Sequence, residues 1–208
     1  QFFEICNKFF KLINFEFSTY LSTRPEKFMG DQATWDYAQK LLEEALKRND
    51  IIFEVKAGEG AFYGPKIDID VKDALGRKWQ LGTIQLDFQM PLRTEAQYEG
   101  QDGKKHYAVM IHRAILGSLE RFIGVLTEHY GGKFPLWLSP VQVRILSVAD
   151  RFNNYAYQLQ QKYSAKGVRV EVDSRAETIP YKVREAELQK INYVLVVGER
   201  EAGKNLVT

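Results

Sequence analysis

Apolar residues in the first part of the chain follow a helical period. Between residues 2 and 15 their spacing predicts an amphipathic helix, and a strand is expected around residues 15–21. A single apolar stripe between residues 34 and 49, followed by Asn49 and Asp50 as a stop signal, predicts a second helix. Each of these helices has one apolar side that can cover a sheet.

After the second predicted helix the pattern changes to three strand-like runs, at 51–55, 66–71 and 79–88. The glycine-containing turns between these runs are too short for helical crossovers, so we predict antiparallel strands. A polar segment, 94–105, leads to the run 112–130, whose apolar positions predict one long helix that ends at a double glycine.

A change of composition near Pro135 predicts a domain boundary, because two prolines follow the double glycine there. We expect a first domain over 1–134 and a second over 135–208. In the second domain apolar strands alternate with helices, the first helix capped by Asp150, which predicts a parallel sheet with right-handed crossovers. Its expected strands are 141–148, 168–173 and 193–199, and its expected helices are 151–165 and 180–191. The fold class is therefore α/β (α+β), an antiparallel sheet followed by a small α/β domain.

Composition and charge limit the classes of protein that fit. Of the 208 residues, 45% are hydrophobic and 27% are charged, which is typical of folded globular proteins. The formal net charge of +2 does not by itself indicate a nucleic-acid partner. A single cysteine, Cys6, allows no internal disulfide and favours a reducing compartment. No apolar run reaches the roughly 18 residues of a membrane span, so we expect no membrane partner.

Three segments of the first domain carry residues that are unusual for a scaffold. Segment 58–66 contains three glycines and a proline, so its backbone can approach a ligand, although a tight hairpin is the structural alternative. The polar side chains of strand 79–88 either bind a polar ligand or face solvent on the open side of the sheet. In segment 111–121, Arg121 suits a phosphate, whereas a lone histidine such as His112 is more often structural than a metal ligand.

Together these segments resemble the threonyl-tRNA synthetase family. That family shows, in the same order, the runs LSTRPEK, GEGAFYGPK, LGTIQLDF and MIHRAILGSLERFIGVL of this chain. The resemblance covers essentially the whole chain and is to the C-terminal part of the bacterial and organellar enzymes. It implies the end of a class II catalytic domain followed by the anticodon-binding domain shared with the prolyl, histidyl and glycyl enzymes.

The resemblance also implies a reaction and the residues that serve it. Threonine would be activated with Mg²⁺-ATP to threonyl-adenylate and then transferred to tRNA(Thr). His112 matches one of the family's three Zn²⁺ ligands, and that metal binds the amino and hydroxyl groups of threonine. Arg121 matches the catalytic arginine that contacts ATP. The other implied contacts are Gln80 and Thr83 for ATP, and Tyr63, Gln85, Lys66 and Ser118 for threonine.

In the second domain the resemblance implies contact with the tRNA anticodon. Arg175 follows the second predicted strand and Glu201 follows the third, so both are candidates for reading unpaired bases. Solvated surface charge is the alternative for each of them.

The chain departs from the family pattern in what it lacks. The first two class II motifs are absent, and with them the dimer interface, the zinc-binding cysteine and the first zinc histidine; Cys6 lies after that cysteine's position. Because a catalytic zinc needs about three protein ligands, we predict that this chain alone neither binds zinc tightly nor activates threonine. Both ends look cut, since Thr208 falls where an apolar strand begins, and we therefore expect a piece of a longer protein. We expect that protein to be a homodimer in the cytoplasm, with the mitochondrial matrix as the alternative location.

Two other functions compete with that of a synthetase fragment. A non-catalytic, synthetase-derived tRNA- or RNA-binding module would explain the second domain, but not why His112, Gln80, Gln85 and Arg121 occur together. Another class II synthetase, such as the prolyl enzyme, does not explain the run IHRA at 111–114. We therefore expect a threonine–tRNA ligase whose activity needs the longer parent chain.

Overall fold

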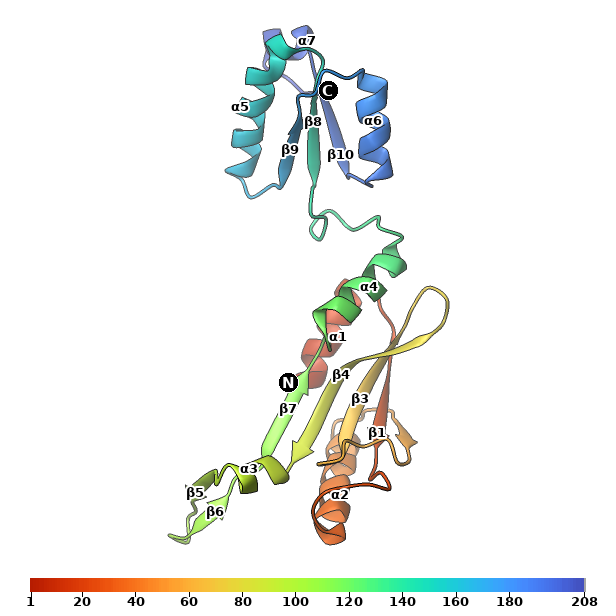
Figure 1. Cartoon of the computed structure of the whole chain (residues 1–208), viewed down its shortest axis with the longest axis vertical. Helices are drawn as coiled ribbons and strands as arrows, with labels where there is room; N and C mark the ends of the chain where they lie inside the picture. Colours follow the sequence, from red (N-terminus) through yellow and green to blue (C-terminus); the bar gives the residue numbers. More distant parts are fainter. Residues whose placement is uncertain (208) are drawn as a thin grey trace. The chain divides into compact units, whose positions relative to one another are not determined.

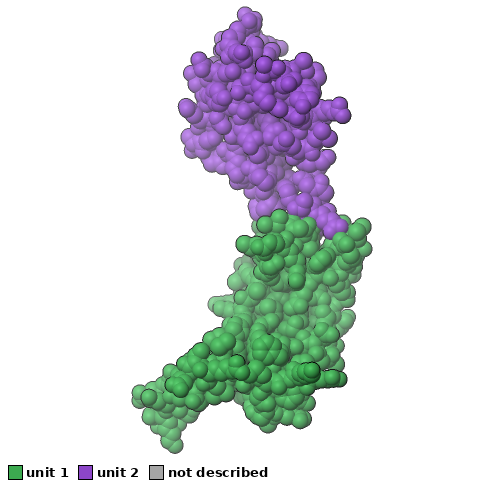
Figure 2. Space-filling model, viewed as in Figure 1, with its two compact units in different colours: residues 1–126 green, residues 127–208 purple. Residues whose placement is uncertain are grey.

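The computed structural model describes residues 1–207, and the chain divides into two compact units, Gln1–Leu126 and Thr127–Thr208 (Figure 2). Each unit contains its own β-sheet. The domain limits expected from composition, 1–134 and 135–208, stay a prediction, since the units are defined by contacts alone. Within residues 1–207 no helix combines the length and the apolar character needed to cross a membrane.

The first unit is built on a five-stranded sheet with the order β2-β1-β3-β4-β7 (Figure 1). The strands are β1 (Phe17–Ser22), β2 (Glu54–Lys56), β3 (Lys66–Lys72), β4 (Lys78–Asp87) and β7 (Met110–Ala114). Strands β1, β3, β4 and β7 pair antiparallel, as predicted for β3 and β4. The same prediction is wrong for β2, which pairs parallel to β1, because the helix α2 (Gln32–Arg48) between them supplies the crossover connection.

Alternation along the strands gives this sheet an apolar face and a polar face. Ile67 of β3 lies on the apolar face, where Leu42 and Leu46 of α2 pack in the same buried cluster. Helix α1 reaches the same face, since the ring of Phe10 lies 5.4 Å from that of Phe17. The helices of the first unit are α1 (Phe2–Leu12), α2 (Gln32–Arg48), α3 (Gln89–Arg93) and the start of α4 (Leu119–Tyr130). With helices on one side, the polar side of the sheet is left for a site.

Strand β4 carries one residue more than the part of β3 that it faces. The register shifts between Ile69, which faces Gly82, and the next residue, which faces Gln80, so Leu81 is the extra residue of a β-bulge. A Cβ atom on Gly82 would lie 3.0 Å from that of Ile69, so glycine relieves the crowding at the bulge. The bulge also resets the alternation, which places Gln80 and Thr83 on the same face although three positions separate them.

The run 112–130, predicted as one long helix, forms a strand and then a helix. Its first residues pair with β4 as part of β7, and α4 begins only at Leu119. Gly117 lies between them at φ +64°, a conformation that a right-handed helix cannot contain. The tertiary pairing with β4 therefore overrides the helical period. The polar segment before β7 forms the hairpin β5 (Gln97–Glu99) and β6 (Lys105–Tyr107).

The second unit has the parallel sheet that the alternation of strands and helices predicted, with the order β10-β8-β9. Its strands are β8 (Val143–Ser147), β9 (Val170–Asp173) and β10 (Tyr193–Val197), and its helices are α5 (Asn153–Ser164), α6 (Ile179–Leu188) and α7 (Glu199–Lys204). Helices α5 and α6 lie on opposite faces of the sheet (Figure 1). On the α5 face, Ile145, Ala156, Leu159 and Val197 form the buried core.

Two local predictions in this unit are wrong. Asp150 does not cap α5, because it opens a short 3₁₀ turn (Asp150–Phe152) without a side-chain capping bond, and the α-helix starts after that turn. The strand expected at the C-terminus does not form over 205–207, where Asn205 ends α7 in a left-handed conformation, φ 55°. Thr208 lies outside the described residues.

Candidate functional site

A buried carboxylate, Asp68, is the centre of a polar cluster on the open face of the first sheet. It accepts hydrogen bonds from Ser22 Oγ at 2.6 Å, Gln80 Nε2 at 2.5 Å and Thr83 Oγ1 at 3.3 Å. Lys66 Nζ forms an ion pair with it at 2.8 Å. The cluster therefore joins Gln80, Thr83 and Lys66, three of the predicted site residues, around an acid that the sequence analysis missed.

The position of Asp68 follows from the strand pattern KIDIDV. In this run isoleucine and aspartate alternate, so the aspartates occupy one face of β3 and the isoleucines the other. Asp68 is only 2% exposed, and a carboxylate that is buried needs partners. An acidic residue at every second position of an apolar strand is the signal in the sequence that could have identified this face.

A second cluster forms where the segment 58–66 meets β4 and β7. The phenol of Tyr63 donates a hydrogen bond to Gln85 Oε1, and Gln85 is the residue of β4 that pairs with His112 of β7. The ring centroids of Tyr63 and His112 are 5.7 Å apart. His112 Nε2 lies 2.9 Å from Asp87 Oδ2. Tyr63, Gln85 and His112, predicted from separate segments, are thus in contact with one another.

Asp87 holds this second cluster; it is one of the polar side chains of strand 79–88 singled out from the sequence, although the family resemblance gave it no role. Its other oxygen, Oδ1, accepts hydrogen bonds from the backbone N–H groups of Gln89 at 2.8 Å and Met90 at 2.9 Å. Burial raises the pKa of Asp87, but the contact with His112 and the two backbone bonds outweigh burial and hold the pKa below its usual range. Burial and the charge of Asp87 raise the pKa of Tyr63. Near neutral pH the cluster therefore holds a carboxylate and a neutral phenol.

A small pocket of about 170 Å³ opens beside these residues. The carboxylate of Asp87 and the guanidinium of Arg93 both line it, so a ligand with one cationic and one anionic group would find a partner for each. Its volume is below the roughly 300 Å³ at which drug-sized ligand pockets begin, which favours a ligand of amino-acid size. The lining residues are Met29, Phe62, Tyr63, Asp87, Gln89, Met90, Arg93 and His112.

Arg121 lies at the start of α4 and connects that helix to the first cluster. Its Nη1 atom donates to the backbone carbonyl of Gln80 at 3.1 Å, while its side chain remains exposed. Ser118 accepts a hydrogen bond from the backbone N–H of Arg121 at 3.2 Å, which is the contact of a helix cap. The structure therefore gives Ser118 a capping contact, whereas most of the Arg121 guanidinium stays accessible to an anion.

The residues present do not make a complete zinc site. His112 has the form of a ligating histidine held by a carboxylate, an arrangement common at metal centres. Within residues 1–207, however, no group of three or more His, Cys, Asp or Glu side chains could hold a metal ion. A zinc ion bound through His112 would therefore need further ligands from outside this chain.

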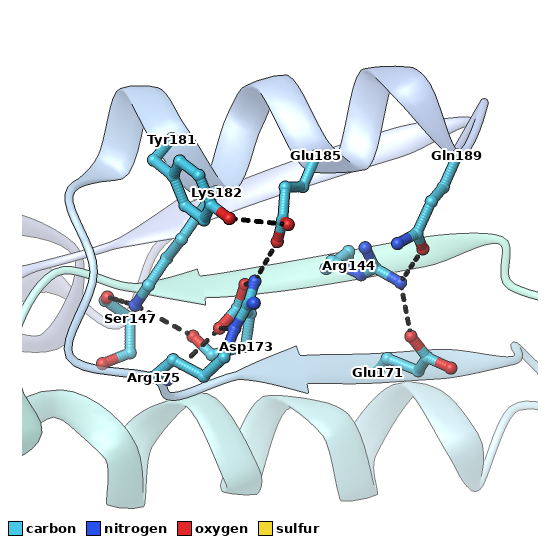
Figure 3. A network of polar contacts seen from close by, with 9 residues as sticks. All are labelled: Arg144, Ser147, Glu171, Asp173, Arg175, Tyr181, Lys182, Glu185 and Gln189. Carbon is cyan, nitrogen blue, oxygen red and sulfur yellow. Dashed lines mark hydrogen bonds and ion pairs between the residues drawn. The ribbon is translucent and has the colours of Figure 1, made fainter.

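In the second unit, the two predicted anticodon residues follow the carboxyl ends of parallel strands, so they lie at the same edge of the sheet. Arg175 pairs with both oxygens of Asp173 and with Glu185 (Figure 3). Glu201 accepts a hydrogen bond from the backbone N–H of Gly198 at 3.0 Å and so caps α7. Neither residue is simple solvated surface charge.

Two family models match this chain. Residues 2–130 match the tRNA synthetase class II core domain of the G, H, P, S and T enzymes. Residues 142–208 match the anticodon binding domain. The first match alone covers more than half of the chain.

Individual relatives agree with the family models. The threonine–tRNA ligase of Finegoldia magna is 53% identical to this chain over 99% of its length. That of Carboxydothermus hydrogenoformans is 54% identical over 95%. The chain spans about a third of their length, 32% and 31%.

Solved structures show the same fold. The RNA binding domain of threonyl-tRNA synthetase from Cryptosporidium parvum is 42% identical, with a TM-score of 0.90 over 100% of this chain and 52% of that one. A structure described as a threonyl-tRNA synthetase of Aeropyrum pernix is 28% identical, with a TM-score of 0.68 over 98% of this chain and 51% of that one. The chain belongs to the class II aminoacyl-tRNA synthetases and is a region of threonyl-tRNA synthetase that joins a class II core to an anticodon-binding domain.

Proposed function

We propose that this chain supplies part of the aminoacylation site and the anticodon-binding domain of a threonine–tRNA ligase that uses Mg²⁺-ATP, threonine and tRNA(Thr). The observation that carries the proposal is the pair of clusters on the open face of the sheet, one around Asp68 and one around His112 and Asp87. The first unit, extended to Phe134, serves the reaction, and the part from Pro135 onward serves tRNA recognition. The protein acts as a homodimer.

The pocket beside Tyr63 holds threonine. Asp87 attracts the amino group, and Arg93, which also lines the pocket, attracts the carboxylate. Tyr63 and Gln85, joined by their hydrogen bond, orient the substrate, and Lys66 is held nearby by its ion pair with Asp68. The zinc ion of the family would add direct coordination of the threonine amine and hydroxyl, with His112 as one ligand and the other ligands from outside this chain.

ATP lies along the first cluster, toward α4. Arg121 contacts a phosphate, because its guanidinium is permanently charged and, among residues 1–207, only its Nη1 atom has a hydrogen-bond partner, the backbone carbonyl of Gln80. Gln80 and Thr83 lie beside Asp68 on the same face, within reach of the nucleotide. The threonine carboxylate attacks the α-phosphate and pyrophosphate leaves. A hydroxyl of the terminal ribose of the tRNA then attacks the carbonyl carbon of the adenylate, loses its proton, and displaces AMP. Fixed charges and fixed orientation supply most of the rate enhancement.

A second candidate function is RNA binding without catalysis. The structural relative from Cryptosporidium parvum that covers 100% of this chain is described as an RNA binding domain. Such a module would use the second unit and would need neither the pocket nor the accessible arginine of α4.

The test is the natural gene product, purified from its source. We expect an intact mass well above 24.1 kDa and threonine-dependent exchange of pyrophosphate into ATP. In that protein Arg121→Lys should lower the exchange rate about 100-fold, the scale of one lost transition-state contact. Arg48→Lys, at the exposed end of α2, should leave it unchanged. A 24.1 kDa product that binds tRNA but exchanges no pyrophosphate would overturn the ligase and favour the RNA-binding module.

A further inference from the structure

The buried carboxylate of Asp68 divides its partners between its two oxygens. Oδ1 accepts hydrogen bonds from Gln80 Nε2 at 2.5 Å and from Thr83 Oγ1 at 3.3 Å, and both donors belong to β4. Oδ2 accepts a hydrogen bond from Ser22 Oγ at 2.6 Å and forms the ion pair with Lys66 Nζ at 2.8 Å. Each oxygen therefore holds one group of side chains, and a single acid joins the two groups.

The group at Oδ2 belongs to the side of the pocket. Lys66 of β3 pairs with Gln85 of β4, and Gln85 accepts the hydrogen bond from the phenol of Tyr63. Residues that pair across antiparallel strands have their side chains on the same face of the sheet. The Lys66 side chain therefore starts beside the pocket cluster and extends from there to Asp68.

The group at Oδ1 belongs to the side of α4. Gln80 pairs with Asp70 of β3, and Arg121 of α4 donates to the backbone carbonyl of Gln80 at 3.1 Å. Lys66 and Asp70 are four positions apart on β3, which corresponds to about 13 Å of extended strand. Lys66 and Gln80 are thus attached to the sheet far from each other, and they approach Asp68 from opposite ends.

Rotation of the Asp68 carboxylate is the physical link between the two groups. The torsion that turns the carboxylate of an aspartate has broad minima, so the hydrogen-bond partners set its orientation. Turning this planar group moves both oxygens at once, so displacing a donor at one oxygen shifts the acceptor for the donors at the other. Asp68 is only 2% exposed and Ser22 is 0% exposed, which gives water little access to replace a lost partner.

We propose that Asp68 is a positioning residue that couples the threonine side of the aminoacylation site to the ATP side. One of its oxygens holds Lys66, the other holds Gln80 and Thr83, and movement on either side is transmitted through the carboxylate. The proposal rests on the function proposed above, in which these three side chains serve the two substrates. Asp68 itself touches neither substrate, because it is buried and its oxygens accept four contacts within residues 1–207.

A double-mutant cycle in the natural gene product tests the coupling. The variants are Lys66→Met, Gln80→Met and their combination, and the readout is kcat/KM for threonine-dependent exchange of pyrophosphate into ATP. Substitutions this far apart have independent effects unless they share a partner. If Asp68 joins them, either substitution alone disturbs the carboxylate, so the double variant should retain about 10-fold more activity than the product of the two single effects.

The same cycle in an Asp68→Asn background identifies the path of the coupling. A carboxamide has one acceptor oxygen where the carboxylate has two, so it can hold only one of the two groups. The effects of Lys66→Met and Gln80→Met should then multiply to within about 2-fold. Coupling that persists in this background would run through the substrates or the backbone, and it would overturn the inference.

Michaelis constants separate positioning from support of the fold. Asp68→Asn should raise the KM values for threonine and for ATP, each by about 10-fold, the scale of one lost hydrogen bond to a charged group. A residue that only stabilised the sheet would lower the active fraction, and with it kcat, while both KM values stayed the same. That second result would also overturn the inference.

Ser22→Ala keeps the test decisive where circular dichroism shows that Asp68→Asn does not fold. It removes one donor from Oδ2, and Ser22 is not among the residues expected to contact a substrate. Both KM values should rise about 3-fold, the lower range for one hydrogen bond. The matched control is Ser18→Ala on the same strand, since Ser18 pairs with Asp70 and should change neither value. Equal KM values in these two serine variants would contradict the proposed role of Asp68.

Failure of this inference and failure of the proposed function give different results. A native gene product that exchanges pyrophosphate, but in which the effects of Lys66→Met and Gln80→Met multiply, would keep the ligase function and lose the coupling. A native gene product without threonine-dependent exchange would overturn the function, and the inference with it.

Discussion

Gly64 is the residue at which the segment 58–66 comes closest to the sheet. A Cβ atom at this position would lie 1.7 Å from the backbone oxygen of Leu86, which cannot move without breaking β4. Gly64→Ala should therefore lower the free energy of unfolding by about 3 kcal/mol or more, the upper range for overpacking. It should also displace Tyr63, its neighbour in the pocket.

The matched control is Gly124→Ala in α4, where an added Cβ would meet nothing within 4 Å. Alanine in a helix interior should stabilise the protein by up to about 1 kcal/mol. Urea unfolding of the two variants measures both effects. Equal changes in the two would contradict the close approach at Gly64.

Asp73 organises the turn between β3 and β4 and should make stability depend on acid pH. Burial raises its pKa, but hydrogen bonds from Trp79 Nε1, Arg77 Nε and two backbone N–H groups lower it further, to about 2 from an ordinary 3.8. Because the folded-state pKa lies below the unfolded one, the stabilisation is complete above about pH 4 and is lost as the pH falls toward 2.

We expect Asp73→Asn to be less stable than the native chain at pH 7, since the uncharged amide of asparagine cannot accept all the hydrogen bonds that the carboxylate accepts. The difference between the two should narrow below about pH 4, where the native carboxylate begins to take up its proton. Unfolding midpoints in urea at pH 7, 4.5 and 3 measure this trend. A difference that stays constant with pH would show that the charge of Asp73 is not what stabilises the turn.

His112 is the one predicted zinc ligand, and it is held by Asp87 at 2.9 Å. A single imidazole and its carboxylate partner are fewer than the roughly three protein ligands of a catalytic zinc. The purified 208-residue chain, dialysed against buffered zinc, should therefore contain far less than one zinc per chain by elemental analysis. A ratio near one that His112→Ala abolishes would contradict this expectation.

At the scale of elements, α2 stabilises the first unit through the side that faces the sheet. Leu46 is 0% exposed and packs in the cluster with Ile67, whereas Leu41 on the same helix is 37% exposed. Leu46→Ala should cost about 2–5 kcal/mol because it removes buried methyl groups and leaves a cavity. Leu41→Ala should cost about 1 kcal/mol or less. Urea unfolding checks the contrast, and similar losses in both would mean that α2 does not dock by this side.

Elements with a strong local period could be predicted from the sequence, and elements set by distant pairing could not. The parallel sheet predicted for the second unit from its alternating strands and helices is confirmed, since each strand and helix there has its own apolar pattern. The residues of β7 have helical spacing, and only their pairing with β4 makes them a strand. The antiparallel pairing predicted for β2 was wrong, because the direction of β2 depends on β1, α2 and β2 together: the chain crosses over through α2 and makes the two strands parallel.

The candidate site, too, could be predicted only in part from the sequence. Tyr63, Gln85 and His112 lie in segments that are unusual for a scaffold, but the family resemblance supplied their roles, and the structure brings them into contact. Asp68 was missed, and Asp87 was singled out only as one of the polar side chains of its strand, since an aspartate in a strand reads as solvent-facing until its partners are known. Their roles depend on distant residues, which no local pattern reveals.

For the whole molecule, each unit has its own buried core, so we expect two unfolding transitions. Ile145 is 0% exposed in the core of the second unit, and Leu46 is 0% exposed in that of the first. Ile145→Ala should lower the midpoint of one calorimetric transition, and Leu46→Ala that of the other, each by several degrees. A single transition that both substitutions lower equally would mean that the units unfold as one.

The bulge in β4 has a consequence for how this strand can change over time. Leu81 is the extra residue that allows Gln80 and Thr83 to meet the same carboxylate. A regular strand sends residues three positions apart to opposite faces, so this spacing places both side chains beside Asp68 only because of the bulge. A further residue inserted between them would turn the side chains on one side of the insertion to the opposite face, whereas loss of Leu81 would restore regular pairing and keep Gln80 and Thr83 on one face. Descendants of this chain should therefore tolerate a deletion at this point more readily than an insertion.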